Sequence, residues 1–176
     1  MSESPYPMIS PDEAFRLVTT SVQTLAPVRV PLDEALGHVL ATEVRAGENV
    51  PPFRSSAMDG YAVIAADTTE EREVLGEQDA GHVSAFQVRP GTAVRIMTGA
   101  ALPEGADAVI PVEYAREAHG RVRFIKTFPA GANVRPVGQD LALGDLLLSP
   151  GLVLGAAEIG LLATVGQTEV TVYPRP

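Results

Sequence analysis

The sequence contains no cysteine among its 176 residues. This absence excludes a disulfide framework, a thiolate metal site and a cysteine nucleophile. No run of 18 or more apolar residues is present, so we expect no membrane-spanning helix. The first ten residues, MSESPYPMIS, lack the basic and apolar regions of a secretory signal. We therefore expect a cytoplasmic protein.

Basic residues are also scarce: 13 Lys and Arg stand against 22 Asp and Glu, giving a net charge of −9. A chain of this charge repels nucleic acid and anionic lipid, and its cations form no cluster. We expect neither as a partner. The hydrophobic content of 45% is that of a globular protein, and the length suits one domain or two small ones.

An N-terminal helix is predicted over Pro11–Leu25. Ser10 is a favourable N-cap, Pro11 suits the first helical position, and Glu13 completes a capping box. Apolar residues at helical spacing form one stripe, namely Ala14, Phe15, Leu17, Val18, Val22 and Leu25.

The middle of the chain has a different character. Short apolar segments separated by Gly and Pro predict strands at 61–65, 85–88, 93–97, 108–112, 122–127 and 145–148. A helical pattern returns in GAAEIGLLATVG, with Gly166 as its stop, and TEVTVY predicts a final strand. The expected fold is α+β but mostly β: a β-rich barrel- or sandwich-like module inserted into a small α/β unit, preceded by the N-terminal helix.

The segment PPFRSSAMDGYAV combines two prolines, a pair of serines and an Asp-Gly pair, which is more than an ordinary loop requires. Asp59-Gly60 is typical of a hairpin turn, in which Gly60 adopts a positive φ, and composition favours this interpretation. The alternative is a carboxylate held on a stiff loop to bind Mg²⁺ or orient water. Ser55 and Ser56 then offer hydroxyls to a polar ligand.

Two further loops carry candidate residues. In RIMTGAALPEG, Thr98 offers a hydroxyl and Gly99 a backbone amide for an oxyanion, although Thr-Gly is usually a turn. In NVRPVGQD, Arg135 suits a phosphate or carboxylate, and Asp140 follows on the same loop. The alternative interpretation is a surface Arg–Asp pair that contributes at most about 1 kcal/mol. No Walker loop, nucleophile elbow or zinc signature is present.

Four blocks in sequence, PPFRSSAMDGYAV, IMTGAALPEGADAVIPVE, NVRPVGQDLALGD and IGLLATVG, resemble the N-terminal half of the molybdopterin molybdotransferases, the MoeA and gephyrin E-domain family. The resemblance covers residues 10–176. It implies an N-terminal helix (1–26) that packs on the family's third domain, a discontinuous first domain (27–45 and 147–176) and an inserted β-rich second domain (46–146). The third and fourth domains are expected beyond residue 176.

The family inserts molybdate into adenylated molybdopterin with Mg²⁺, as an elongated homodimer. The resemblance implies that Asp59, Thr98 and Asp140 are catalytic, with Asp59 and Asp140 as Mg²⁺ ligands. Ser55, Ser56, Gly99 and Arg135 are implied as substrate-binding residues. The implied partners are the chain's own C-terminal domains, a second copy and the molybdopterin adenylyltransferase. Arg54-Ser55 and Gln139 depart from the family's motifs, which often have Asp-Asn and Glu there.

The resemblance shifts the interpretation of Asp59 from a turn residue to a functional one. The resulting hypothesis is an enzyme part that is inactive alone in molybdenum insertion. A stand-alone dimerisation or scaffold module with the same fold is the alternative. An independent hydrolase is the weakest hypothesis, because no nucleophile–base constellation is visible.

Overall fold

The computed structural model describes residues 8–82 and 85–175. Residues 1–7 and 176, at the ends of the predicted 1–26 and 147–176 segments, lie outside the described residues. The chain divides into two compact units, one formed by Met1–Val44 with Leu147–Pro176 and the other by Arg45–Leu146. No helix in the described ranges is long and apolar enough to cross a membrane.

The described elements follow one another in this order along the chain: α1 (Pro11–Ser21), β1 (Val28–Pro31), η1 (Leu32–Glu34), β2 (Val39–Leu40), β3 (Val44–Arg45), β4 (Ser55–Ser56), β5 (Gly60–Val63), β6 (Glu71–Gln78), β7 (Thr92–Ile96), β8 (Ala108–Pro111), η2 (Val112–Tyr114), β9 (Ala115–Ala118), β10 (Arg121–Phe124), β11 (Val134–Arg135), β12 (Leu146–Leu148), α2 (Ala156–Thr164) and β13 (Glu169–Tyr173).

Helix α1 begins as the sequence predicts. The Ser10 hydroxyl accepts a hydrogen bond from the Glu13 amide at 3.1 Å. It ends at Ser21, not at the predicted Leu25, and Val22 has an extended backbone. The last turn consists of Thr19, Thr20 and Ser21, whose hydroxyls bond to carbonyls three and four residues earlier; such residues favour helix ends. The apolar stripe is exposed at Phe15, Leu17, Val18, Val22 and Leu25.

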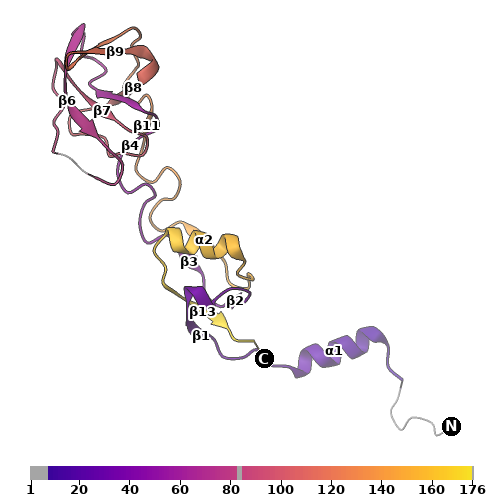
Figure 1. Ribbon diagram of the computed structural model, residues 1–176. Helices are drawn as coiled ribbons and strands as arrows, with labels where there is room; N and C mark the ends of the chain where they lie inside the picture. Colours follow the sequence, from indigo (N-terminus) through magenta and orange to yellow (C-terminus); the bar gives the residue numbers. More distant parts are fainter. Residues whose placement is uncertain (1–7, 83–84, 176) are drawn as a thin grey trace. The chain divides into compact units, whose positions relative to one another are not determined.

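The unit formed by the two chain ends is built on a three-stranded sheet in the order β1-β13-β2. Both pairings are antiparallel. Helix α2 lies beside this sheet (Figure 1). Its residue Leu162 belongs to the same buried cluster as Val170 and Val172 of β13, and Gly166 after the helix adopts a positive φ. The buried core residues of this unit are Ala35, Leu40, Leu148, Leu154, Leu162, Val170 and Val172.

The other unit contains a curled, half-barrel sheet of six described strands in the order β8-β5-β7-β6-β10-β9. Strands β6 and β7 run parallel and side by side (Figure 1), while the other neighbours are antiparallel. Side chains alternate along β5: Tyr61 and Val63 enter one apolar cluster, and Ala62 enters another. The sheet therefore has a core on each face.

Three features of this sheet differ from the prediction, and one of them is the edge strand β9, which was not predicted. The longest strand, β6, was not predicted, because EREVLGEQ carries charged residues on an exposed face and a glycine. The predicted strand at 85–88 is wrong, because only Gln87 forms an isolated bridge there, with Glu104. Local composition favours a strand, but no neighbouring strand pairs with the rest of that segment.

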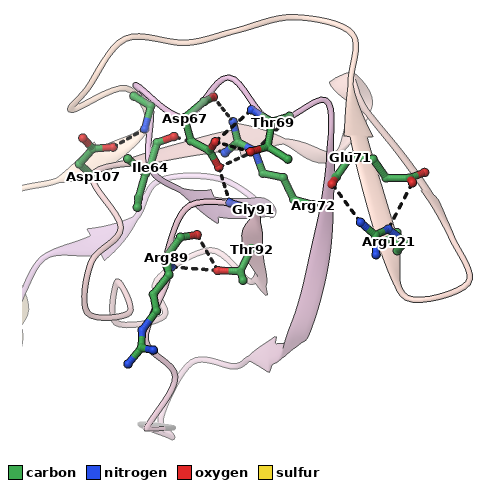
Figure 2. A network of polar contacts seen from close by, with 11 residues as sticks. Ile64, Asp67, Thr69, Glu71, Arg72, Arg89, Gly91, Thr92, Asp107 and Arg121 are labelled. Atoms are coloured by element: carbon green, nitrogen blue, oxygen red, sulfur yellow. Dashed lines mark hydrogen bonds and ion pairs between the residues drawn. The ribbon is translucent and has the colours of Figure 1, made fainter.

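A buried ion pair holds the loop between β5 and β6. The Arg72 Nε lies 3.3 Å from Asp67 Oδ2, and both side chains are about one-twentieth exposed. Figure 2 shows that Asp67 also accepts hydrogen bonds from the Gly91 amide at 2.8 Å and from Thr69. Arg72 donates to the carbonyls of Ile64, Asp67 and Thr69. This network ties the loop to the turn before β7.

The predicted fold class is confirmed in its main features. The described chain is mostly β, it begins with a helix, and a second helix lies near its end. A two-stranded sheet of β3 and β12 stands where the chain leaves the first unit and returns to it.

Candidate functional site

Strand β4 brings the three predicted loops together. Its residue Ser56 pairs with Val134 of β11. The Ser56 carbonyl accepts a hydrogen bond from the Gly99 amide at 2.8 Å, and the Ser56 amide donates to the Ala100 carbonyl at 3.0 Å. The loops at 51–60, 97–101 and 133–140 therefore meet at β4, although they are far apart in the sequence.

The Asp59-Gly60 pair does not form the predicted hairpin turn, and that expectation is wrong. Strand β4 pairs with β11, whereas β5 pairs with β7 and β8. Gly60 does not have a positive φ. Glycine is required for another reason: a Cβ atom at position 60 would lie 2.2 Å from the Ile110 carbonyl oxygen. The close approach of β5 and β8 thus explains this residue.

Asp59 is held by Thr98 from the neighbouring loop. The Thr98 hydroxyl donates to Asp59 Oδ1 at 2.6 Å, and the Thr98 amide donates to the same oxygen at 2.7 Å. The hydroxyl bond, followed by the amide bond, lowers the pKa of Asp59 below its ordinary value of 3.8. The second oxygen, Oδ2, accepts no hydrogen bond from the described residues. Asp59 therefore presents an ionised carboxylate with one oxygen occupied and one available.

Ser55, Ser56 and Gly99 shape the loops. Both serine side chains are buried, and the Ser56 hydroxyl donates to the Met58 carbonyl, which closes the turn before Asp59. The Gly99 and Thr98 amides already donate to Ser56 and Asp59. Gly99 has a φ of +81°, a left-handed conformation that favours glycine. Its backbone geometry is what allows the loop to turn beside β4.

Arg135 and Asp140 form an ion pair across their own loop, through Nη2 and Oδ2. The loop is fixed at its base, because the Gly138 amide donates to Pro51 and the Asp140 amide to Val50, both at 2.9 Å. Arg135 itself lies in β11, opposite Ser55. The Arg135 side chain is about one-third exposed and the Asp140 side chain about half exposed.

The described residues do not by themselves make up a metal site. No group of three or more His, Cys, Asp or Glu residues that could hold an ion occurs among them. Mg²⁺ requires close to six oxygen ligands. Asp59 has one oxygen occupied by Thr98, and Asp140 is engaged by Arg135. The expected Asp59–Asp140 magnesium site therefore does not fit this chain alone.

Sequence reasoning missed a polar cluster on the strands next to Asp59. Tyr61 is buried and its hydroxyl donates to Glu117 Oε2. Burial first, and then Glu117, raises the pKa of Tyr61 to about 12. Arg95, opposite Tyr61 on β7, lies 3.9 Å from Glu117. The alternation in GYAV indicates an inward Tyr61, but its partner is distant in the sequence.

Comparison with known proteins shows what the chain is similar to. Residues 9–166 match the family described as "MoeA N-terminal region (domain I and II)". The chain is 36% identical over 191 residues to "Molybdopterin molybdenumtransferase 1" of Mycobacterium tuberculosis, covering 96% of this chain and 45% of the relative. It is 38% identical over 175 residues to "Molybdopterin molybdenumtransferase 2" of the same organism, covering 96% and 43%.

A solved structure is also similar. The molybdopterin biosynthesis moeA protein from Pyrococcus horikoshii OT3 superimposes with a TM-score of 0.85 at 31% identity, over 94% of this chain and 46% of that one. The chain thus spans about half the length of the relatives that it matches. The family match over residues 9–166, together with the agreement in fold, shows that this chain belongs to the MoeA N-terminal region family.

Proposed function

We propose that this chain is the N-terminal part of a molybdopterin molybdenumtransferase and supplies loop residues to a composite site. The observation that carries the proposal is the Asp59–Thr98 contact, in which two hydrogen bonds hold an ionised carboxylate in place. The relatives similar over nearly the whole chain are named as molybdopterin molybdenumtransferases. The proposed reaction is the insertion of molybdate into adenylated molybdopterin during molybdenum cofactor biosynthesis.

Within this proposal Asp59 and Thr98 are the catalytic pair of the chain. Thr98 fixes Oδ1 with two hydrogen bonds, so the carboxylate cannot rotate freely and Oδ2 keeps one direction. Such a carboxylate can accept a hydrogen bond from a water molecule or from a protonated phosphate oxygen, and so orient that group for hydrolysis of the adenylate. Ser55, Ser56 and Gly99 contribute by shaping the loops, and Arg135 by offering a cation to an anionic substrate. Asp140, which pairs with Arg135 on the same loop, is the third candidate catalytic residue that the chain contributes to this site.

The remainder of the site is proposed to lie outside this chain. Molybdate and the pterin nucleotide are anions, whereas the chain carries a net charge of −9. An acidic surface repels such ligands, so their main binding groups belong to the C-terminal domains of the full protein. A magnesium ion at this site takes most of its ligands from those domains or from the substrate, because the described residues alone do not form a metal site.

The exposed apolar face of α1 supports a further part of the proposal. Phe15, Val18 and Val22 are each more than half exposed. An apolar face of this size usually lies against a partner. We propose that the C-terminal domains cover it in a cytoplasmic homodimer, and that the molybdopterin adenylyltransferase is a transient partner. The same face also supports the alternative, a dimerisation or scaffold module without catalysis.

A domain exchange tests the proposal. The matching N-terminal region of the first M. tuberculosis relative is replaced by this chain, and insertion of molybdate into adenylated molybdopterin is measured. We expect activity in the chimera, no activity from the isolated chain, and loss of activity in the chimera with Asp59→Asn. A fully active Asp59→Asn chimera would overturn the catalytic role of Asp59 and favour the scaffold.

A further inference from the structure

The Arg135–Asp140 pair lies on a loop that is already constrained at its base. The Gly138 and Asp140 amides donate to Pro51 and Val50, so the loop returns to the segment that precedes β4. A Cβ atom at position 138 would lie 3.0 Å from Asn49 Oδ1, so the loop packs closely there. At its other end, Arg135 is fixed by its pairing with Ser55. The carboxylate of Asp140 connects the two ends of this loop.

Arg135 has more hydrogen-bond donors than Asp140 uses. A guanidinium group carries five N–H donors, and the contact with Asp140 is made through Nη2. Nε and Nη1 have no acceptor among the described residues. The side chain is about one-third exposed, so these nitrogens remain within reach of a ligand.

Asp140, by contrast, is poorly suited to bind a metal ion. Its Oδ2 already accepts a charge-assisted hydrogen bond, the stronger class of hydrogen bond. A cation at that oxygen would have to displace Arg135 or lie beside its positive charge. No third carboxylate or histidine in the described chain joins it to make an ion-binding group.

We propose that Asp140 is a positioning residue: its carboxylate holds the Arg135 guanidinium, so that the remaining Arg135 donors face a phosphate-bearing ligand. Asp140 then acts through Arg135 and does not ligate a metal ion. The proposal rests on the proposed function only in taking this loop as part of the substrate site. The Arg135–Asp140 contact itself is a property of this chain and does not depend on the proposed function.

The first test uses NMR on the ¹⁵N-labelled chain. Amide hydrogen exchange at positions 138–141 is compared in wild type, Asp140→Asn, Arg135→Gln and the double variant. A half-exposed pair contributes at most about 1 kcal/mol, so each single change should speed exchange by up to about fivefold. The double variant should exchange no faster than either single variant. Asp140→Glu keeps a carboxylate and should restore most of the protection.

Glu48→Gln provides the control. It removes one negative charge from an exposed side chain that precedes Asn49, the residue that packs against Gly138, and it leaves Arg135 and Asp140 unchanged. It should leave exchange at 138–141 unchanged. Additive effects of Asp140→Asn and Arg135→Gln, or no effect of Asp140→Asn, would overturn the positioning role.

The second test asks directly about metal. Mn²⁺ is titrated into the same sample, because its paramagnetism broadens amide signals near any bound ion. We expect no saturable broadening centred on residues 59 and 140. Saturable broadening that is centred on both residues and lost in Asp140→Asn would show that Asp140 is a ligand, and the proposal would fail.

The third test separates positioning from catalysis in the active chimera. Loss of Arg135 donors from a charged ligand should raise KM about tenfold or more in Arg135→Gln, with a smaller rise in Asp140→Asn and little change in kcat. A fall in kcat at unchanged KM in Asp140→Asn would contradict the proposal. The NMR results do not depend on turnover, so failure of the proposed function and failure of this inference are distinguishable.

Discussion

Asp67→Asn is the substitution that most sharply tests how the β-rich unit is stabilised. It removes the negative charge from a carboxylate that is only about one-twentieth exposed and leaves Arg72 buried beside it. Breaking a buried ion pair by changing one partner typically costs about 3–5 kcal/mol. Asparagine still accepts a hydrogen bond from the Gly91 amide, and Arg72 keeps its backbone carbonyls. We therefore expect a loss of about 3 kcal/mol, the lower end of that range.

The assay is urea denaturation followed by NMR, since a chain of two compact units need not unfold in one step and residue-level signals follow each unit by itself. The midpoint for amides of residues 60–124 should fall, while the midpoint for amides of β13 stays unchanged. Glu70→Gln lies on the same loop, is exposed, and should change stability by no more than about 0.5 kcal/mol. If Asp67→Asn behaves like Glu70→Gln, the argument that this ion pair stabilises the unit is refuted.

The same carboxylate predicts a pH dependence. Burial alone raises the pKa of Asp67, but hydrogen bonds from Gly91 and Thr69, together with the Arg72 charge, bring it below its ordinary value of 3.8. A folded-state pKa below the unfolded one means that the unfolded chain binds more protons in between. Stability from Asp67 is therefore complete above about pH 4 and lost as the pH falls through the folded pKa. Asp67→Asn should lack this contribution.

Three further predictions concern the strands around Asp59. Gly60→Ala should destabilise the unit by about 1–3 kcal/mol or more, because the added Cβ meets a backbone carbonyl. Gly47→Ala is the control and should be tolerated, because position 47 has open space around it. Equal melting temperatures for the two variants would contradict this prediction. Thr98→Val should raise the pKa of Asp59, measured by carboxyl NMR titration, because the hydroxyl bond is the main cause of its lowering; an unchanged pKa would contradict it. Tyr61 should ionise near pH 12 in an absorbance titration. Because its folded pKa lies above the unfolded value of about 10, the stability that Tyr61 contributes should be lost between pH 10 and 12. The Tyr61→Phe variant should lack this loss of stability.

The ends of the fold were predictable because their signals are local. Three such signals each depend on residues only a few positions apart in the sequence: the Ser10 cap, the glycine after α2 and the alternation in the final strand. The C-terminal end of α1 was less predictable. Its apolar spacing continues to Leu25, but the hydroxyl-rich turn at 19–21 ends the helix first.

The interior of the β-rich unit was harder to predict because pairing decides it. Strand β6 is charged along much of its length and becomes a strand through β7 and β10 on either side. The segment at 85–88 looks like a strand but lacks a continuous neighbour. Gly60 shows the same limit: the sequence indicates a glycine that matters, while only the approach of Ile110 explains why.

The candidate site was predicted as a set of residues but not as an arrangement. Asp59 and Thr98 were expected to act near one another, and they are joined by two hydrogen bonds. The resemblance implied that Asp140 joins Asp59 at a magnesium ion, whereas the alternative taken from the residues, a surface Arg135–Asp140 pair, is the contact that the structure shows. A sequence shows that carboxylates sit on loops, but not which cation each one meets.

The most direct test of the central claim is the activity of the chimera with Asp59→Asn, measured together with its melting temperature. We predict loss of molybdate insertion with an unchanged melting temperature, because the side chain is exposed and Asn can still accept both Thr98 bonds. Full activity would contradict a catalytic role. A parallel fall in activity and melting temperature would show that Asp59 serves the loop and not the chemistry.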